Sequence, residues 1–351
     1  MQELTILQPD DWHLHLRDGD TLPGTVAHAA RRFGRALIMP NLQPAVTTVE
    51  DALSYRSRIM AARPAGSDFE PLMSLYLTDH TSPAEVQRAA DNPHIIAIKL
   101  YPAGATTHSE YGVTGLSGLA ATFEAMEALG LPLLVHGEST EPGVDVFDRE
   151  ARFVQRELTW IVERFPALRV VLEHVTTAEG VDFVRQGGAT IAATITAHHL
   201  LLNRNAMFDG GLLPHAYCLP VLKRERHREA LLEAATSGHA RFFLGTDSAP
   251  HPRARKESAC GCAGIYTAHA SIELYAQVFE QASALGQLEA FASLHGPRFY
   301  GREPNARQLV LQRREWEVPP TYRLGTTDTV PLFAGQTVAW QLASDYAARG
   351  R

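Results

Sequence analysis

The stretch that decides the fold is IIAIKL, residues 95–100, in which every position except Lys99 is apolar. A strand with one face in water alternates apolar and polar residues, whereas a strand covered on both faces is apolar throughout. The same unbroken character recurs in LIMP at 37–40, LPLLVH at 131–136, VVLEH at 170–174 and FFLGTD at 242–247. These runs predict buried strands of a parallel sheet.

Outward from these runs, the chain alternates strand-like and helix-like segments. Eight strand candidates are bounded by turn residues: Asp11–Leu16, Ala36–Pro40, Pro71–Leu77, Ile95–Leu100, Pro132–His136, Arg169–His174, Ala189–Thr194 and Arg241–Thr246. The helix-like stretches include Val46–Ala62, Leu116–Leu129, Asp148–Phe165, Ala178–Gln186 and Arg224–Thr236. This alternation predicts the α/β class, and eight strands predict a (β/α)8 barrel, the TIM-barrel fold.

The length of the chain fits one such domain. A (β/α)8 barrel takes about 250 residues and often carries insertions, and this chain has 351 residues. A helix-like stretch from Thr267 to Ala284 follows the last strand, and an irregular tail runs from Leu285 to Arg351. We expect a barrel over residues 1–300 and a short C-terminal extension, residues 301–351, packed on it.

Composition and charge argue against several classes of function. The net charge is -7, and the chain has no basic stripe with interleaved aromatic residues, so we expect no nucleic-acid partner. No apolar run approaches the roughly 18 residues of a membrane helix, and residues 1–10 lack the pattern of a signal peptide. We therefore expect no membrane contact, a cytoplasmic location and a small-molecule substrate.

The three cysteines, Cys218, Cys260 and Cys262, are too few for a disulfide framework and odd in number. We expect them to be reduced. Cys260 and Cys262 suggest a soft metal site, but two thiols one residue apart lack the second pair that structural zinc sites use. A loop or packing role is the favoured interpretation.

The stretch WHLHLR, residues 12–17, carries the strongest local chemical signal. Side chains alternate faces along a strand, so His13, His15 and Arg17 share one face. We expect that face to line the barrel interior, while Trp12, Leu14 and Leu16 point outward and pack beneath the helices. Two imidazoles on one face can chelate zinc. The alternative is a pair of interior histidines satisfied by hydrogen bonds.

Further metal-competent residues stand at the ends of other predicted strands. Lys99 ends the fourth strand, His136 the fifth and His174 the sixth, and Asp247 follows the eighth. The carboxyl ends of barrel strands meet at one mouth, where the active sites of this architecture lie. Packing alone does not explain such residues at so many strand ends, because each buried polar group would need a partner. The set therefore predicts a metal centre.

Lys99 requires its own explanation, because an ammonium has no lone pair for a metal. If burial and nearby cations lower its pKa, the neutral amine can react with carbon dioxide to form a carbamate. A carbamate is anionic and can bridge two ions. The alternative is an ammonium paired with Asp247 or with a carboxylate of the substrate.

This set of residues, with His-x-His-x-Arg on the first strand, resembles the amidohydrolase superfamily. Longer motifs resemble one family within it, the short bacterial (class II) dihydroorotases: PDDWHLHLRDGD, IMPNLQPAVTT, KLYPAGATT, PLLVHGE, FDREARF, EHVTT, AATITAHHL, YCLPVLKR, FLGTDSAPH and RKESACGCAG. The motifs spread from Pro9 to Gly264, whereas the tail beyond about Gly301 matches only loosely.

The resemblance implies a centre of two zinc ions per subunit. The implied ligands are His13 and His15 for the more buried ion, His136 and His174 for the other, Lys99 as a bridging N6-carboxylysine, and Asp247. Asp247 is implied to be the catalytic acid/base as well. A homodimer is also implied.

The resemblance further implies how a substrate is held at the barrel mouth. The implied substrate contacts are His15, Arg17, Asn41, His136, Leu219, His251 and Ala263, the leucine and the alanine through their backbone. Arg17 offers a planar fork that suits a carboxylate. Thr106 and Thr107 are implied to belong to a lid, and the stretch around them, Pro102–Gly112, has the composition of a mobile loop.

The implied reaction is the reversible cyclisation of N-carbamoyl-L-aspartate to (S)-dihydroorotate plus water, a step of de novo pyrimidine (UMP) biosynthesis. In the ring-opening direction a hydroxide bridging the two ions attacks the cyclic amide. Asp247 then passes the proton to the departing ring nitrogen.

Two alternatives to this function remain open. Another two-metal hydrolase, hydantoinase-like or phosphotriesterase-like, would use the same ligands, although Arg17 and Asn41 supply a carboxylate clamp that a neutral phosphotriester would not use. A catalytically inactive barrel serving as a scaffold for a transcarbamoylase would be expected to have lost a metal ligand, and none is missing. Of the remaining histidines, His198 and His199 are interpreted as structural or as neighbours of the ligands.

Overall fold

Eight parallel strands form the centre of the computed structural model, which describes residues 2–259 and 261–343. The strands follow one another in chain order around a single sheet: β2 (Asp11–Leu14), β3 (Arg35–Ile38), β4 (Glu70–Tyr76), β5 (Ile95–Leu100), β6 (Leu133–Val135), β7 (Val170–Leu172), β8 (Ile191–Ile195) and β9 (Phe242–Leu244). Each predicted strand overlaps one of these and differs from it by at most two residues at either end.

The sheet closes on itself where β2 meets the residues that follow β9. The amide of Asp247 donates to the carbonyl of His13 at 2.9 Å, and the amide of His15 donates to the carbonyl of Ser248 at 3.2 Å. Leu14 and Ser248 also form a parallel bridge. The predicted barrel is therefore confirmed, and its closing contacts involve the same residues as the predicted metal site.

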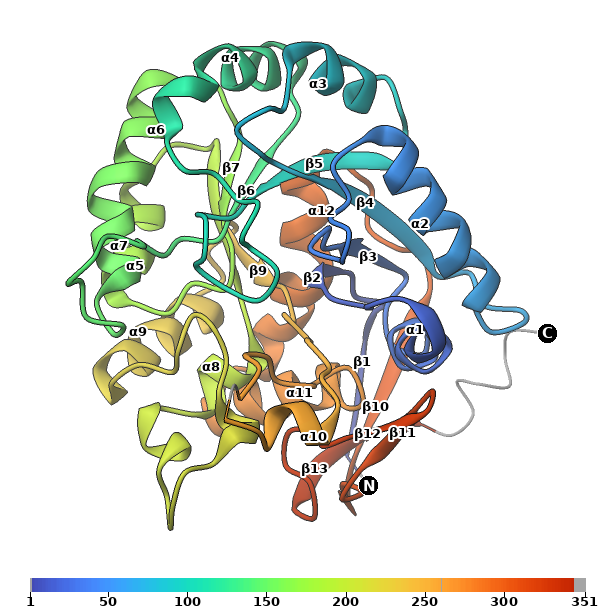
Figure 1. Ribbon diagram of the computed structural model, residues 1–351. Helices are drawn as coiled ribbons and strands as arrows, with labels where there is room; N and C mark the ends of the chain where they lie inside the picture. The colour runs from blue at the N-terminus through green and yellow to red at the C-terminus, as the bar shows by residue number, and fades with distance from the viewer. Residues whose placement is uncertain (1, 260, 344–351) are drawn as a thin grey trace.

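Most helices lie around the barrel, while α12 lies behind its strands in the view of Figure 1. The helices are α1 (Leu22–Ala30), α2 (Val49–Ala62), α3 (Pro83–Ala90), α4 (Ala120–Leu129), α5 (Arg149–Phe153), α6 (Thr159–Arg164), α7 (Ala178–Gln186), α8 (Ala197–Leu201), α9 (Glu225–Thr236), α10 (Arg253–Lys256), α11 (Ser271–Gln281) and α12 (His295–Tyr300). Side-chain caps start several of them, such as the capping box of Thr48 and Asp51 before α2. In the described ranges, no helix is long and apolar enough to cross a membrane.

The two ends of the chain share a second, antiparallel sheet. Strand β1 (Glu3–Leu7) pairs with β10 (Gln308–Glu317), and β10 pairs with β13 (Thr337–Leu342). A separate hairpin joins β11 (Tyr322–Leu324) to β12 (Thr327–Thr329). The expectation of an irregular tail is therefore wrong, and β1, on the barrel side of the boundary predicted at residue 300, belongs to the same sheet as the extension.

Trp12 lies in the barrel interior, so the expectation that it packs outward is wrong. It belongs to a buried cluster with Leu37 and Phe243, and its ring stacks on Tyr300 of α12 with centroids 4.3 Å apart. The register of β2 against β3 shifts between Asp11 and Leu14. This shift breaks the strict alternation of faces, because an irregular residue in a strand re-aims the side chains around it.

Gly296 on α12 allows this helix to approach Trp12 closely. A Cβ at this position would lie 1.9 Å from Nε1 of Trp12, so Gly296→Ala must push the helix away from the barrel. We expect the variant to lose about 1–3 kcal/mol of unfolding free energy, measured by urea titration. Gly286→Ala is the control, because its Cβ meets nothing within 4 Å. Equal stability of the two variants would show that α12 shifts without cost.

Candidate metal centre

The side chains predicted for the site meet in one cavity at the carboxyl ends of the barrel strands. Its free volume is only about 20 Å³, so the surrounding side chains and the loop over it nearly fill the cavity. Its lining includes these predicted residues: His13, His15, Arg17, Asn41, Thr106, Thr107, His136, His174, Leu219, Asp247 and Ala263. His251 lines an adjoining cavity together with Arg17 and Ala263. Lys99 is fully buried, and its charge influences His136 and His174.

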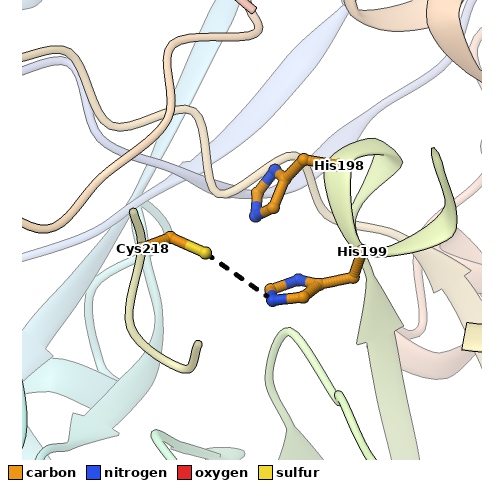
Figure 2. A group of neighbouring side chains, drawn as sticks. All are labelled: His198, His199 and Cys218. Carbon is orange, nitrogen blue, oxygen red and sulfur yellow. Dashed lines mark hydrogen bonds between the residues drawn. The ribbon is translucent and has the colours of Figure 1, made fainter. Parts of the chain in front are cut away.

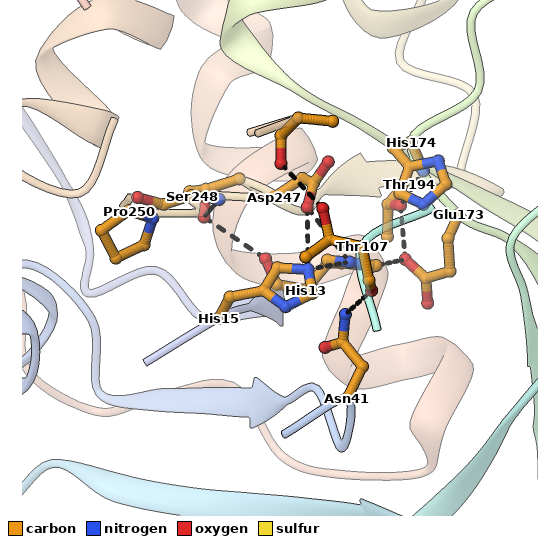
Figure 3. Close-up of polar contacts among 12 residues, drawn as sticks. His13, His15, Asn41, Thr107, Glu173, His174, Thr194, Asp247, Ser248 and Pro250 are labelled. Atoms are coloured by element: carbon orange, nitrogen blue, oxygen red, sulfur yellow. Dashed lines mark hydrogen bonds and ion pairs between the residues drawn. The ribbon is translucent and has the colours of Figure 1, made fainter. Parts of the chain in front are cut away.

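Three candidate ligand atoms converge at the centre of this cavity (Figure 3). The Nε2 atoms of His13 and His15 are 3.3 Å apart. Oδ1 of Asp247 lies 3.4 Å from the first and 3.0 Å from the second. All three side chains are buried. An arrangement of two imidazoles and one carboxylate is suited to a divalent cation such as zinc.

The backbone is bent sharply at several of these positions. Arg17, His174 and Asp247 have φ angles of 60°, 41° and 45°. Residues other than glycine rarely adopt this left-handed region, and such strain gathers at functional sites. Each of the three residues follows the end of a barrel strand. The strained positions therefore coincide with strand ends that carry candidate site residues.

Two buried glutamates orient candidate ligands, and the sequence analysis did not predict this role for them. Oε2 of Glu173 accepts from Nδ1 of His13 at 2.7 Å, and Oε2 of Glu138 lies 2.9 Å from Nε2 of His136. Such partners fix the ring orientation and leave the other nitrogen for a metal. Their positions beside candidate ligands could have indicated this role, since Glu173 directly precedes His174 and Glu138 closely follows His136.

Lys99 has the environment that a carbamate requires. Burial lowers the pKa of its amine to about 8, against a weaker opposing effect of Glu173 and Asp247. Its Nζ has no hydrogen-bond partner among the described residues, and it lies 5.1 Å from the centre of the Tyr101 ring. An ion pair with Asp247, the alternative considered above, does not form within the described part of the chain. A reactive neutral amine is therefore accessible near neutral pH.

The residues fit a centre of two cations. Nδ1 of His174 is buried without a partner, like Nζ of Lys99. The ring of His174 lies between those of His13 and His136, with centroids 4.9 Å and 4.8 Å away. Buried polar atoms without partners are rare in native proteins and mark places where an ion or water is expected. A bound cation would satisfy the imidazole nitrogen of His174, whereas Lys99 would first need to become a carbamate, whose oxygens can bind a cation.

The protonation states suit this use. Burial lowers the pKa of His15 to about 4 and that of His174 well below its ordinary value. Both rings are therefore neutral and can offer a lone pair to a metal. Burial raises the pKa of Asp247, but hydrogen bonds from His13 and His15 outweigh it and lower that pKa well below the ordinary range. Asp247 is therefore an anion at neutral pH.

The predicted carboxylate clamp stands at the outer wall of the cavity. Nη2 of Arg17 lies 3.0 Å from Nε2 of His251, and Nε of Arg17 donates to the carbonyl of Pro250 at 3.1 Å. Burial and, to a lesser extent, the charge of Arg17 lower the pKa of His251 to about 2, so the ring is neutral. Arg17 thus supplies the positive charge of this wall.

The predicted lid lies against this clamp. Thr107 accepts from Nδ2 of Asn41 at 3.1 Å through its carbonyl, and its hydroxyl donates to the carbonyl of Ala263 at 3.3 Å. Tyr76 donates to the carbonyl of His108 at 3.2 Å. These contacts close the loop over the cavity.

A buried lysine holds together the two backbone segments expected to touch a substrate. Nζ of Lys256 donates to the carbonyls of Tyr217, Cys262 and Gly264 at 2.7, 2.8 and 2.8 Å. Two of these carbonyls flank Ala263 in sequence. Burial lowers the pKa of Lys256 to about 8, and the three acceptors favour its charged form at neutral pH.

Lys256→Met should therefore weaken substrate binding more than catalysis. We expect KM to rise about tenfold, which corresponds to about 1.4 kcal/mol, while metal content and kcat change little. Steady-state kinetics and metal analysis check this. Arg253→Met, which changes an exposed side chain of the same helix, is the control. A fall in kcat and metal content at unchanged KM would contradict the positioning role.

The soft metal site considered above for Cys260 and Cys262 stays untested, because Cys260 lies outside the described residues. Cys218 and Cys262 are free thiols, the first buried and the second half-buried.

Comparisons with known proteins agree with this geometry. The family model described as the amidohydrolase family matches residues 10–306. A dihydroorotase from Aromatoleum aromaticum is 64% identical over 343 residues, which cover 97% of this chain and 100% of that protein. This chain belongs to the dihydroorotases of the amidohydrolase family.

Solved structures of other dihydroorotases have the same fold. The dihydroorotase from Campylobacter jejuni has a TM-score of 0.89 at 36% identity, covering 97% of each chain. The dihydroorotase from Saccharomyces cerevisiae, solved in complex with 5-fluoroorotic acid, has a TM-score of 0.89 at 32% identity and covers 98% of this chain and 99% of its own. The predicted membership is confirmed, whereas the role of each site residue stays a prediction.

Proposed function

We propose that this chain catalyses the reversible cyclisation of N-carbamoyl-L-aspartate to (S)-dihydroorotate and water in de novo pyrimidine biosynthesis. The observation that carries the proposal is that His13, His15, His136, His174 and Asp247 line the same cavity as Arg17 and Asn41. The reaction needs both sets, because the amide bond requires an activated nucleophile and the substrate is an anion. The high identity to a dihydroorotase over the whole chain supports it.

The proposed ligands of two zinc ions are His13, His15, Lys99 as its carbamate, His136, His174 and Asp247. When bound, the ions would lower the pKa of a water molecule and polarise the carbonyl of the cyclic amide. Glu173 and Glu138 hold the imidazoles of His13 and His136 in the orientation that this set needs.

Asp247 is the proposed acid/base. It is an anion within the ligand cluster, so it can accept a proton from the attacking water. In ring opening it then donates that proton to the ring nitrogen as the C–N bond breaks, and in cyclisation the transfers run in reverse. One group serves both steps, because the proton it accepts is the one it later donates.

Arg17, Asn41 and His251 are the proposed partners of the substrate carboxylate. Arg17 brings the charge, and the amide of Asn41 is already directed at the lid carbonyl of Thr107. A carboxylate bound here would therefore contact the barrel wall and lie beneath Thr106 and Thr107. The loop then excludes water from the reacting amide, as closing lids do in other enzymes.

A direct assay tests this function. The zinc-loaded protein is given dihydroorotate, carbamoyl aspartate, an uncharged hydantoin and a phosphotriester under identical conditions. We expect turnover of the first two in opposite directions and little of the others, because only the first two carry the carboxylate that Arg17 attracts. Faster hydrolysis of the hydantoin or the phosphotriester would overturn the proposal. Bound metal far below two equivalents per chain, with no turnover, would favour the inactive scaffold.

We also propose a cytoplasmic homodimer, following the family resemblance. Light scattering of the purified protein measures the mass in solution. A mass equal to one chain at all concentrations would exclude the dimer.

A further inference from the structure

A second cluster of metal-competent side chains lies outside the ligand set proposed above. It consists of His198 and His199 on α8 and Cys218 on the segment that follows it (Figure 2). One ligand atom from each residue lies within 4.8 Å of the others. All three are buried, with exposed fractions of 0%, 2% and 1%. The cluster is therefore closed and preformed, like the structural zinc sites of other proteins.

A fourth donor stands at the same place. Sγ of Cys218 lies 3.8 Å from Nε2 of His199. The carbonyl oxygen of Pro220 lies 3.1 Å from that nitrogen and 3.2 Å from that sulfur. Two nitrogens, one sulfur and one oxygen thus surround a small volume, and tetrahedral sets of this kind suit zinc and its analogues cobalt and cadmium.

His198 supplies an independent indication of a ligand. Neither of its ring nitrogens has a hydrogen-bond partner among the described residues, although the side chain is fully buried. Its ring lies beside that of His199, with centroids 4.5 Å apart. A buried imidazole without any partner is costly unless something else binds it. Packing does not explain such a residue, whereas a cation facing His199 and Cys218 does.

We propose that His198, His199 and Cys218 bind a third divalent cation of borderline-soft character, with Zn²⁺ as the expected metal. His198 coordinates through one of its unpartnered nitrogens, Cys218 as thiolate, and the carbonyl of Pro220 completes the set. This site is separate from the two-zinc centre, which contains no sulfur ligand.

The protons balance in a simple way. The thiol of Cys218 releases one proton to solvent for each ion bound. His199 stays neutral and carries its proton on Nδ1, which lies 2.8 Å from the hydroxyl of Thr196. Its Nε2, which without a metal can donate to the carbonyl of Pro220 at 3.1 Å, then offers a lone pair to the cation. The net change is one cation bound and one proton released, as metal binding to a thiol requires.

The position of the site gives the ion a consequence for the substrate cavity. Leu219 lies between Cys218 and Pro220 in sequence, and it lines the cavity of the proposed active site. A cation that binds both of its neighbours would fix its backbone relative to α8. The proposed metal binding itself does not depend on the proposed reaction, so the two can fail separately.

Protein produced with cobalt in place of zinc tests the site. We expect three equivalents of cobalt per chain, one more than the proposed active-site centre holds, together with a thiolate-to-cobalt charge-transfer band in the near ultraviolet. The band is diagnostic, because cobalt in the active-site centre meets only nitrogen and oxygen ligands. Cys218→Ser and His198→Ala should each abolish the extra equivalent and the band.

The matched control is the double variant Cys260→Ser/Cys262→Ser, which removes the other two thiols of the chain. It should keep both signals. Loss of the band in the double variant, with retention in Cys218→Ser, would assign the extra metal to the other cysteines and overturn the proposal. Absence of a third equivalent in the unmodified protein at equilibrium would do the same. His198→Gln, which keeps a polar side chain, serves if His198→Ala does not fold.

Discussion

Asp247→Asn is expected to lower kcat for dihydroorotate hydrolysis by roughly 10²- to 10⁴-fold, the usual contribution of a general acid/base. Asparagine has nearly the same shape as aspartate, but it neither accepts nor donates a proton in this pH range. It also removes the anion that lies 3.0 Å from Nε2 of His15. The variant therefore loses the proton carrier and weakens one ligand at the same time.

The fold should survive this substitution. The residue has a φ of 45°, and asparagine is among the residues that tolerate the left-handed region best. The amide of residue 247 still donates to the carbonyl of His13, so the barrel stays closed. Circular dichroism and urea unfolding check the structure, and Asp209→Asn, the same change at an exposed position, is the control.

Metal analysis separates the two roles of Asp247. If the variant binds metal weakly and excess zinc restores full turnover, the residue is a ligand alone. If metal content is normal and turnover stays low, the acid/base role is supported. Unchanged turnover at normal metal content would exclude both roles.

Lys99→Met should nearly abolish activity without harming the fold. Methionine fills a similar volume but cannot form a carbamate, so the anion proposed to bridge the two ions is lost. We expect less bound metal and a fall in kcat of roughly 10³-fold or more, since metal-activated water is the proposed source of the nucleophile. Stability should be unchanged or higher, because burial of an amine without a partner opposes folding.

Lys223→Met is the control for Lys99→Met. Lys223 is also buried, but its Nζ donates to the carbonyl of Val221 at 3.0 Å. Its removal should lower stability and leave metal content intact, the opposite pattern. Labelling with ¹³C-bicarbonate then reports the carbamate carbon directly by NMR. Full activity without that signal, or normal metal binding in Lys99→Met, would reject the carbamate.

The barrel was predictable because its strands are short apolar runs that end in polar residues. In IIAIKL, Lys99 is the next-to-last residue of its strand. In VVLEH, His174 follows the end of its strand by two residues. Parallel topology then brings such ends together without further information. The same few segments therefore allowed both the fold and the residues of the candidate site to be predicted.

Other features depended on contacts that no local pattern encodes. Strand β1 is short and its partner lies at the far end of the chain, so it gave no signal of pairing. The inward position of Trp12 follows from a register shift between β2 and β3, which alternation alone cannot reveal. Lys256 contacts Tyr217, 39 positions away, and Glu173 contacts His13, 160 positions away. In the sequence both look like ordinary charged residues.

The pairing of β1 with β10 sets an order of events during synthesis of the chain. Glu3 and Gln312 are 309 positions apart, so the first strand leaves the ribosome long before its partner exists. Until then its edge is unpaired, and such edges recruit other chains. A chain that ends before residue 308 would therefore lack the partner of this strand and leave its edge unpaired.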